Sequence, residues 1–533
     1  MRRTLFLFLF VISQLLAACV DAPVEATPTA QPTRTASAAA NTAAPPTSTV
    51  TPTRTASATP APSLAASLTP IPSQSVPSAT LTPTDPPMLT SLSAAGPWLF
   101  LSAADAQYLV NADGSGLSGL EAFSMPRQGW VWSWQAAPSG PYLVLRADDQ
   151  GTPLLESAPG EWDYQMWVAL LPGVSLARRL PLLTHVARGR IRAEIAANPE
   201  LIPTPLAVAR SLPALWSPDG RYLAFSASLH RTNVDIYLYD TQIDFLQRLT
   251  TSSDDALLRA WSPDGRWIIY EQVSGSCDPQ AYGSACTPQG VAAISLFGTQ
   301  VNLYRQAGPE AILTWSSVHS FLVHNVTSGG PPSNLRQVDI YGPEETPLYL
   351  GAFGSAAYDP SSGVVMLNLS TGPYWRFEGG PVGIYRLEPQ VQVPEQVLAG
   401  DYQFVTWAAV PGLFLAQDFN GPPYDALLFD PSGQVQLRLA DVNAWSKSQA
   451  SSDGRWLLVR HTDGYSLHTA EGNMLLSLGP GRVAWMPDAS AFYFLSCQES
   501  ANALYRYQFE QTWRGVLLSE DIPACLDVAI ITP

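Results

Sequence analysis

The sequence has few charged residues, and among them the basic residues are fewer than the acidic ones. Charged residues make up 14% of the 533 residues, and 28 Lys and Arg face 44 Asp and Glu, which gives a formal net charge of −16. The first 90 residues hold four Arg and three acidic residues (+1), so the remainder carries −17. An acidic body repels phosphate backbones, so nucleic acid is not expected as a partner. The simpler reading of this acidity, solubility of an exported protein, is preferred to an acidic ligand-binding face.

The sequence also lacks the motifs of several enzyme classes. No Gly-x-Ser-x-Gly elbow, phosphate loop or dinucleotide fingerprint occurs. None of the six His forms a His-Glu-x-x-His pair or stands beside Cys at zinc spacing; they are His185, His230, His319, His324, His461 and His468. The sequence therefore predicts no metal site and no cofactor, and it does not favour an enzyme.

The N-terminus carries the parts of an export signal. Arg2 and Arg3 precede an apolar run from Leu5 to Leu15, which is too short to span a bilayer, and the run ends in Leu16-Ala17-Ala18-Cys19. This arrangement resembles a bacterial lipoprotein signal with its lipobox. The resemblance implies a signal peptide at 1–18, a lipid on Cys19, and an extracytoplasmic protein anchored to the cell membrane or envelope of a bacterium. The alternative is an ordinary cleaved signal in which the cysteine is incidental.

The segment that follows has no aromatic residue and is dominated by Thr, Pro, Ala and Ser up to about residue 90. The heptapeptide Pro-Thr-Arg-Thr-Ala-Ser-Ala occurs at 32–38 and again at 52–58. Such a composition cannot build a core, so residues 19–95 are expected to form a disordered tether, on the order of 50 Å long as a coil.

The body of the chain is organised around a repeated hairpin. Trp216-Ser-Pro218-Asp219-Gly220-Arg recurs as Trp261-Ser-Pro263-Asp264-Gly265-Arg, 45 residues later (261 − 216), and each copy leads into an apolar strand. Proline presets the first corner of a turn, Asp bonds its own backbone, and Gly accepts a left-handed conformation. Degenerate copies of the hairpin begin near 132, 315, 358, 407, 451 and 485, which makes eight.

Each hairpin is followed by a second pair of strands, and four strands per repeat is the content of a propeller blade. We therefore predict an all-β fold over 96–533: a single β-propeller of four-stranded blades, with eight blades favoured and seven as the alternative. The strands at 98–101 and 108–110 are expected to complete a blade with the C-terminal strand. Trp216 and Trp261 are expected to fill gaps between blades.

The hairpin from Trp216 to Thr250, and the first half of its twin, resemble the TolB-type WD-like β-propeller repeat. The resemblance implies the fold and assigns the turn residues a structural role, but fold does not determine function.

Two further features are candidates for function or stability. The interval from Gly140 to Gly220 is 80 residues, against 45 for the next, and the insertion around 185–205 holds Arg188, Arg190 and Arg192. A decorative loop is the preferred interpretation of this insertion, and the alternative is that these arginines contact a partner. Besides Cys19, the cysteines are even in number, which predicts the disulfides Cys277–Cys286 and Cys497–Cys525; the alternative is four reduced thiols.

Together these features predict a monomeric, lipid-anchored binding module for a protein, peptide or glycan. The alternative from a different class is a hydrolase or lyase acting on an envelope polysaccharide or peptide. Its carboxylates would meet at the propeller axis, with Asp235, Asp240, Asp339 and Asp425 as candidates. A weaker alternative is a structural envelope protein of TolB type.

Overall fold

The computed structural model describes the chain from residue 92 onward, with gaps. The described residues are 92–103, 106–120, 131–148, 164–171, 178–183, 212–230, 233–274, 287–304, 308–326, 330–342, 345–370, 380–388, 391–408, 410–418, 424–442, 448–497, 502–509, 513–522 and 525–533. The predicted signal peptide, Cys19 and the tether up to residue 91 lie outside these residues, as do Arg188, Arg190, Arg192, Cys277 and Cys286. Residues 92–95, predicted as the end of the tether, belong instead to the folded body, because Leu92 is buried in a core cluster and the Ser93 amide donates to Asn111.

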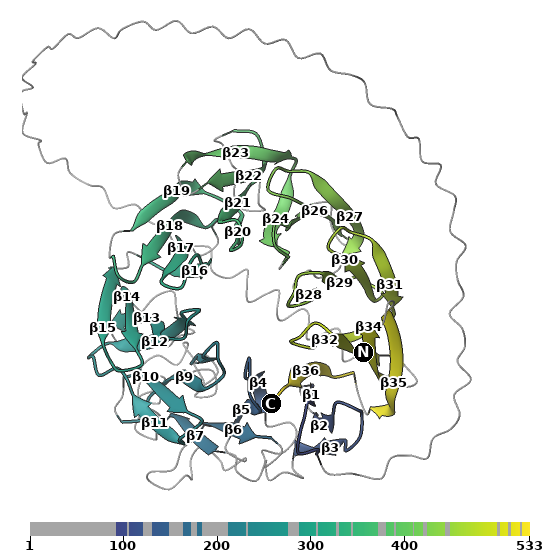
Figure 1. The fold of residues 1–533 in the computed structure, drawn as a ribbon. Helices are drawn as coiled ribbons and strands as arrows, with labels where there is room; N and C mark the ends of the chain where they lie inside the picture. Colours follow the sequence, from purple (N-terminus) through teal and green to yellow (C-terminus); the bar gives the residue numbers. More distant parts are fainter. Residues whose placement is uncertain are drawn as a thin grey trace, which may run out of the picture. The chain divides into compact units, whose positions relative to one another are not determined.

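The described residues form nine four-stranded antiparallel sheets that follow one another around a common axis (Figure 1). We number these blades in chain order. Blade 1 contains β1 (Trp98–Ser102), β2 (Gln107–Asn111), β3 (Ser118–Gly119) and β36 (Asp527–Ile531); blade 2 contains β4 (Val131–Ala136), β5 (Tyr142–Asp148), β6 (Tyr164–Leu170) and β7 (Arg178–Leu183). Blade 3 contains β8 (Ala214–Trp216), β9 (Tyr222–Ala227), β10 (Asp235–Asp240) and β11 (Phe245–Arg248); blade 4 contains β12 (Asp255–Trp261), β13 (Trp267–Ser274), β14 (Thr287–Ser295) and β15 (Gln300–Tyr304). Blade 5 contains β16 (Glu310–Trp315), β17 (Ser320–Asn325), β18 (Ser333–Asp339) and β19 (Thr346–Ala352); blade 6 contains β20 (Ser355–Asp359), β21 (Val364–Leu369), β22 (Gly383–Glu388) and β23 (Val391–Ala399). Blade 7 contains β24 (Tyr402–Trp407), β25 (Phe414–Asp418), β26 (Tyr424–Phe429) and β27 (Val435–Val442); blade 8 contains β28 (Gln449–Ala450), β29 (Trp456–Arg460), β30 (Tyr465–Thr469) and β31 (Met474–Leu478). Blade 9 contains β32 (Gly481–Trp485), β33 (Ala491–Cys497), β34 (Asn502–Phe509) and β35 (Trp513–Ile522).

The all-β propeller of four-stranded blades is confirmed, but the prediction of eight blades, with seven as the alternative, is wrong. All eight hairpins seen in the sequence become the first two strands of a blade, from β4–β5 to β32–β33. The remaining blade, blade 1, has no such hairpin, because its innermost strand is β36 and its second strand is β1, at opposite ends of the described chain. A count of contiguous hairpins therefore misses it.

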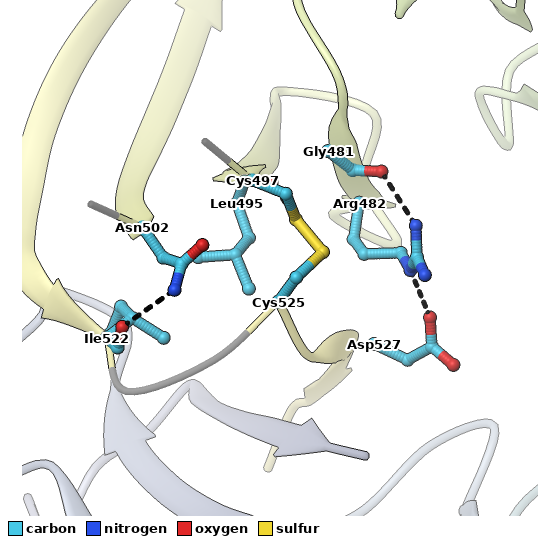
Figure 2. Close-up of a disulfide and its surroundings, with 8 residues drawn as sticks. All are labelled: Gly481, Arg482, Leu495, Cys497, Asn502, Ile522, Cys525 and Asp527. Atoms are coloured by element: carbon cyan, nitrogen blue, oxygen red, sulfur yellow. Dashed lines mark hydrogen bonds and ion pairs between the residues drawn. A yellow bond between two sulfur atoms is a disulfide. The ribbon is translucent and has the colours of Figure 1, made fainter. Parts of the chain in front are cut away.

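The ring closes through blade 1, as the sequence predicted. β36 pairs antiparallel with β1, from Trp98 opposite Ile531 to Ser102 opposite Asp527. The predicted Cys497–Cys525 disulfide is present and joins the end of β33 to the residues just before β36 (Figure 2). Beside it the guanidinium of Arg482, on β32, contacts the carboxylate of Asp527 at 2.6 Å. The covalent bond and the ion pair both tie the closing strand to blade 9.

The core lies between the blades. One hydrophobic cluster combines Val144 and Met166 of blade 2 with Phe225 and Tyr237 of blade 3, all nearly inaccessible to solvent. Because each blade packs on a neighbour on both faces, its middle strands read as continuous apolar runs; every residue of β10 is buried. The repeated apolar strands of the sequence are therefore explained by the stacking of blades.

Candidate functional site

The Ser-x-Asp-Gly turn between the first and second strands is a structural unit. In blade 3 the hydroxyl of Ser217 donates to Asp219 Oδ1 (2.5 Å) and accepts from the Tyr222 amide (2.9 Å), while the Asp219 carboxylate accepts from the Arg221 amide (3.1 Å). The same three bonds recur in blade 4, from Ser262 to Trp267, and in blade 8, from Ser451 to Trp456. Pro218, Pro263 and Asp264 occupy the corresponding turn positions, so these residues serve the fold.

The tryptophan that precedes the turn joins neighbouring blades. The indole Nε1 of Trp261 donates to the carbonyl of Leu215 in the preceding blade (3.0 Å), and Trp216 Nε1 lies 3.4 Å from the carbonyl of Gln135 in blade 2. Trp485 repeats the pattern with the carbonyl of Gln449 (3.3 Å). The acceptors Leu215 and Gln135 are each the second-last residue of the innermost strand of their blade. The contact therefore recurs at equivalent positions of the repeat and links one blade to the next.

One position on the second strand of each blade, polar in seven of the nine blades, was not recognised in the sequence. It lies three residues beyond the partner of the last residue on the innermost strand, or in blade 6 beyond the partner of the second-last residue, Tyr358. In blade 3, Trp216 pairs with Leu223, and Ser226 is the third residue after Leu223. In chain order from blade 2 the residues here are Arg146, Ser226, Glu271, His324, Asn368, Gln417 and Arg460, whereas blades 9 and 1 have Leu495 and Leu101. In the sequence, each of these residues is only a single polar side chain within an apolar strand, which is a weak signal. The pairing register between the first and second strands is needed to show that they occupy equivalent positions.

In several blades this position bonds the backbone of the next blade. Ser226 accepts from the Leu258 amide at 2.9 Å and lies 3.2 Å from the Ala256 carbonyl, and Asn368 Nδ2 donates to the Tyr402 carbonyl at 2.9 Å. The Leu258 amide lies beside a bulge in β12, where the register with β13 shifts. A small hydroxyl or amide is sufficient for this role.

Blade 4 has a carboxylate, Glu271, at the same position. Its side chain is 2% exposed and forms an ion pair with Arg259, which is the extra residue of the β12 bulge. Bulges re-aim side chains and recur beside functional sites. Burial of a charge is costly unless the charge is paired. This cost explains why Arg259 accompanies Glu271, but it does not explain why a carboxylate occupies this position.

A second buried carboxylate faces the same region from blade 5. Glu310, the first residue of β16, has a side chain that is 6% exposed, and it forms an ion pair with Arg336 of β18, which also pairs with Glu345. The Arg336 guanidinium lies 5.1 Å from the ring centre of Tyr304, the last residue of β15. Burial raises the pKa of the Glu310 carboxyl, and Arg336 and Tyr304 only partly oppose this effect. Burial also raises the pKa of the Tyr304 phenol.

These side chains line a pocket of about 240 Å³ between blades 4 and 5. Its lining is mixed: the polar residues are Arg259, Glu271, Tyr304 and Glu310, and the apolar residues are Val291, Ala311, Ile312 and Val323. Glu310 begins an innermost strand whose other end, Trp315, leads into the turn to β17. The part of the pocket formed by Glu310, Ala311 and Ile312 thus lies toward the end of β16 opposite its turn, and we take the pocket as the candidate functional site.

The four aspartates considered for an axial carboxylate site lie elsewhere. Asp235 and Asp240 stand at opposite ends of β10 and pair with Arg248 and Arg221, each at 2.7 Å. Asp339 ends β18 and accepts from Ser320 at 2.7 Å, and Asp425 is exposed on β26. All four belong to third strands, two places out from the innermost strand, in three different blades. The strand order thus places them away from the axis.

Two kinds of feature are absent from the described part of the chain: a metal-binding cluster and a membrane-spanning helix. No group of three or more His, Cys, Asp or Glu within it is arranged to hold a metal ion. Nor does it contain a helix with the length and apolar character needed to cross a membrane.

No protein-family model matches this sequence, and no curated protein matches it either. Among solved structures, a eukaryotic initiation factor is similar with a TM-score of 0.48 and 11% identity, over 82% of this chain and 98% of that one. An oligogalacturonate lyase in complex with manganese has a TM-score of 0.35 and 15% identity over 56% of this chain and 88% of its own. Hydrazine synthase of Kuenenia stuttgartiensis has a TM-score of 0.32 and 12% identity over 57% and 94% of the two chains. At these TM-scores and identities, none of these proteins indicates what this chain does.

Proposed function

We propose that this chain is a lipid-anchored, extracytoplasmic β-propeller that binds a protein or peptide partner, or a glycan. The observation that carries the proposal is the pocket between blades 4 and 5, where the repeating pattern is broken by buried carboxylates on an otherwise structural scaffold. A rigid ring that presents a concave, part-apolar and part-charged site is suited to binding. The lipobox-like Leu16-Ala17-Ala18-Cys19 and the tether of the sequence support the anchored location.

We also propose that the repeats are of the TolB type. The Trp-Ser-Pro-Asp-Gly-Arg hairpins support this assignment, since three copies of the Ser-x-Asp-Gly turn share one hydrogen-bond pattern. A structural envelope role of the TolB kind would be revealed by envelope defects on deletion of the gene.

The anchor is tested by Cys19→Ala. Wild-type protein is expected in the membrane fraction of a bacterial host, with the mass of a lipid on its N-terminal cysteine, and the variant is expected in the soluble fraction or unprocessed. Wild-type protein that fractionates as soluble and carries no lipid would contradict the anchored location.

The binding role is tested by cross-linking in the native cells, identification of the captured protein, and titration of the two purified proteins against each other. Saturable binding of the purified pair that is weakened by Glu310→Gln is expected. A partner that is captured but does not bind the purified propeller would count against the proposal.

The second candidate is a hydrolase or lyase, and one observation favours it. Burial raises the pKa of the Glu310 carboxyl, and this is the direction of shift that a general acid requires. Release of fragments from purified envelope polysaccharide or peptide by wild-type protein, abolished in Glu310→Gln, would establish this activity. Equal release by both proteins would exclude Glu310 as the acid.

A further inference from the structure

We propose that the pocket between blades 4 and 5 receives a basic side chain, lysine or arginine, of a protein or peptide partner. This inference rests on the proposed binding function and narrows the partner to one that presents a cationic side chain. Three observations lead to it: the size of the pocket, the combination of aliphatic and charged side chains that line it, and its net charge.

The size suits a single side chain. Pockets that hold drug-sized ligands usually occupy roughly 300–1,000 Å³, and this one measures about 240 Å³. A folded partner could not enter it, but one extended side chain of that partner could.

The lining offers both kinds of surface that a lysine or arginine side chain uses. The aliphatic residues Val291, Ile312 and Val323 line the pocket together with the carboxylates Glu271 and Glu310, and Glu271 is paired with Arg259. Lysine and arginine bury their methylene stems along apolar surface while the charged head remains in polar surroundings. A glutamate or aspartate of the partner would instead meet two carboxylates.

The charge around the pocket is left negative. Glu271, Glu310 and Glu345 contribute −3, and Arg259 and Arg336 contribute +2, so the group carries −1. The carboxylates of Glu271 and Glu310 are 2% and 6% exposed, where water screens them little. An arriving cation would neutralise this excess charge.

The propeller fold does not require a buried carboxylate at the position of Glu271. Glu271 is the one carboxylate among the nine equivalent second-strand positions, all of which are described. In blades 3 and 6, Ser226 and Asn368 bond the next blade without a charge. A buried ion pair gives little stability compared with such neutral groups, so its presence is better explained by a ligand.

The experiment uses purified full-length protein in detergent and fluorescein-labelled decalysine, decaarginine and decaglutamate, with binding followed by fluorescence anisotropy at about 150 mM salt. Glu310→Gln removes a pocket charge, and Ala311→Phe fills the space without changing the charge. Glu395→Gln is the matched control, because Glu395 lies on β23 of blade 6 with a 66% exposed side chain. Thermal unfolding checks that each variant is folded, and Ile312→Phe replaces Ala311→Phe if that variant is not.

We expect a basic peptide to bind the wild type and the Glu395→Gln control within twofold of each other, and the two pocket variants to bind at least tenfold more weakly. Decaglutamate should not bind. Binding that falls equally in Glu310→Gln and Glu395→Gln, or that survives Ala311→Phe, would assign the interaction to the acidic surface and overturn the pocket proposal. Absence of any basic-peptide binding would overturn it too, while a partner that binds the purified propeller would still support the broader function.

Discussion

Gly220 and Gly265 occupy the same position in successive turns, yet alanine should be tolerated far better at one than at the other. Both have positive φ, +70° and +68°. A Cβ at Gly220 would lie 2.0 Å from the Ser139 carbonyl oxygen and 3.0 Å from its amide nitrogen, because the turn of blade 2 packs against this turn. At Gly265 the nearest atom within 4 Å is Cδ of Pro218, at an ordinary 3.6 Å.

The expected magnitudes follow from two effects. A left-handed alanine costs about 1–2 kcal/mol at either position. At Gly220 the backbone of a second blade must also move, and overpacking of this kind adds about 1–3 kcal/mol. The hydrogen bond of Ser139 Oγ to the Asp219 carbonyl (2.6 Å) would be strained by the same shift. Gly265→Ala should therefore lower the unfolding free energy by about 1–2 kcal/mol, and Gly220→Ala by about 2–5 kcal/mol.

Urea unfolding followed by tryptophan fluorescence measures both variants in parallel. Any effect of alanine on the unfolded chain is shared by the pair and cancels in the difference. Both should keep the wild-type slope with denaturant, so that the shift in midpoint reports stability alone. Midpoints that agree within about 0.5 kcal/mol would refute the reasoning, since the clash with Ser139 would then have no energetic consequence.

Three further predictions concern closure, pH and blade packing. Replacing Cys497 and Cys525 by serine opens a loop of 28 residues and should cost about 3–4 kcal/mol, measured as an earlier urea midpoint; an unchanged midpoint would show that β-pairing alone closes the ring. Burial lowers the pKa of His468, so the unfolded chain binds its proton more readily, and stability should be intact above about pH 6.5 and fall as the pH drops toward 5. His468→Gln should flatten that fall in unfolding free energy, and an identical pH profile would contradict the assignment. Trp261→Phe removes the bond to the Leu215 carbonyl and should cost about 1 kcal/mol in the same assay, and no loss would make that contact incidental.

The sequence by itself determined the repeating element and the closure of the ring. Pro, Asp and Gly act through local turn geometry, which depends on a few neighbouring residues and therefore can be read directly from the chain. The closing strand and Cys497–Cys525 also followed from the sequence, because the strands before the first hairpin lacked an innermost partner, and because Cys497 ends one predicted strand and Cys525 precedes the last.

The number of blades and the candidate site were decided by the tertiary structure. Blade 1 joins β1 to β36 across the whole body, so its innermost and second strands do not form a contiguous hairpin and were left out of the hairpin count. Glu271 and Glu310 are 39 residues apart (310 − 271) and come from different blades, and each resembles an ordinary charged residue in its own strand. Only the stacking of one blade on the next buries both carboxylates beside one pocket, because burial and proximity across blades are set by the ring and have no local signal.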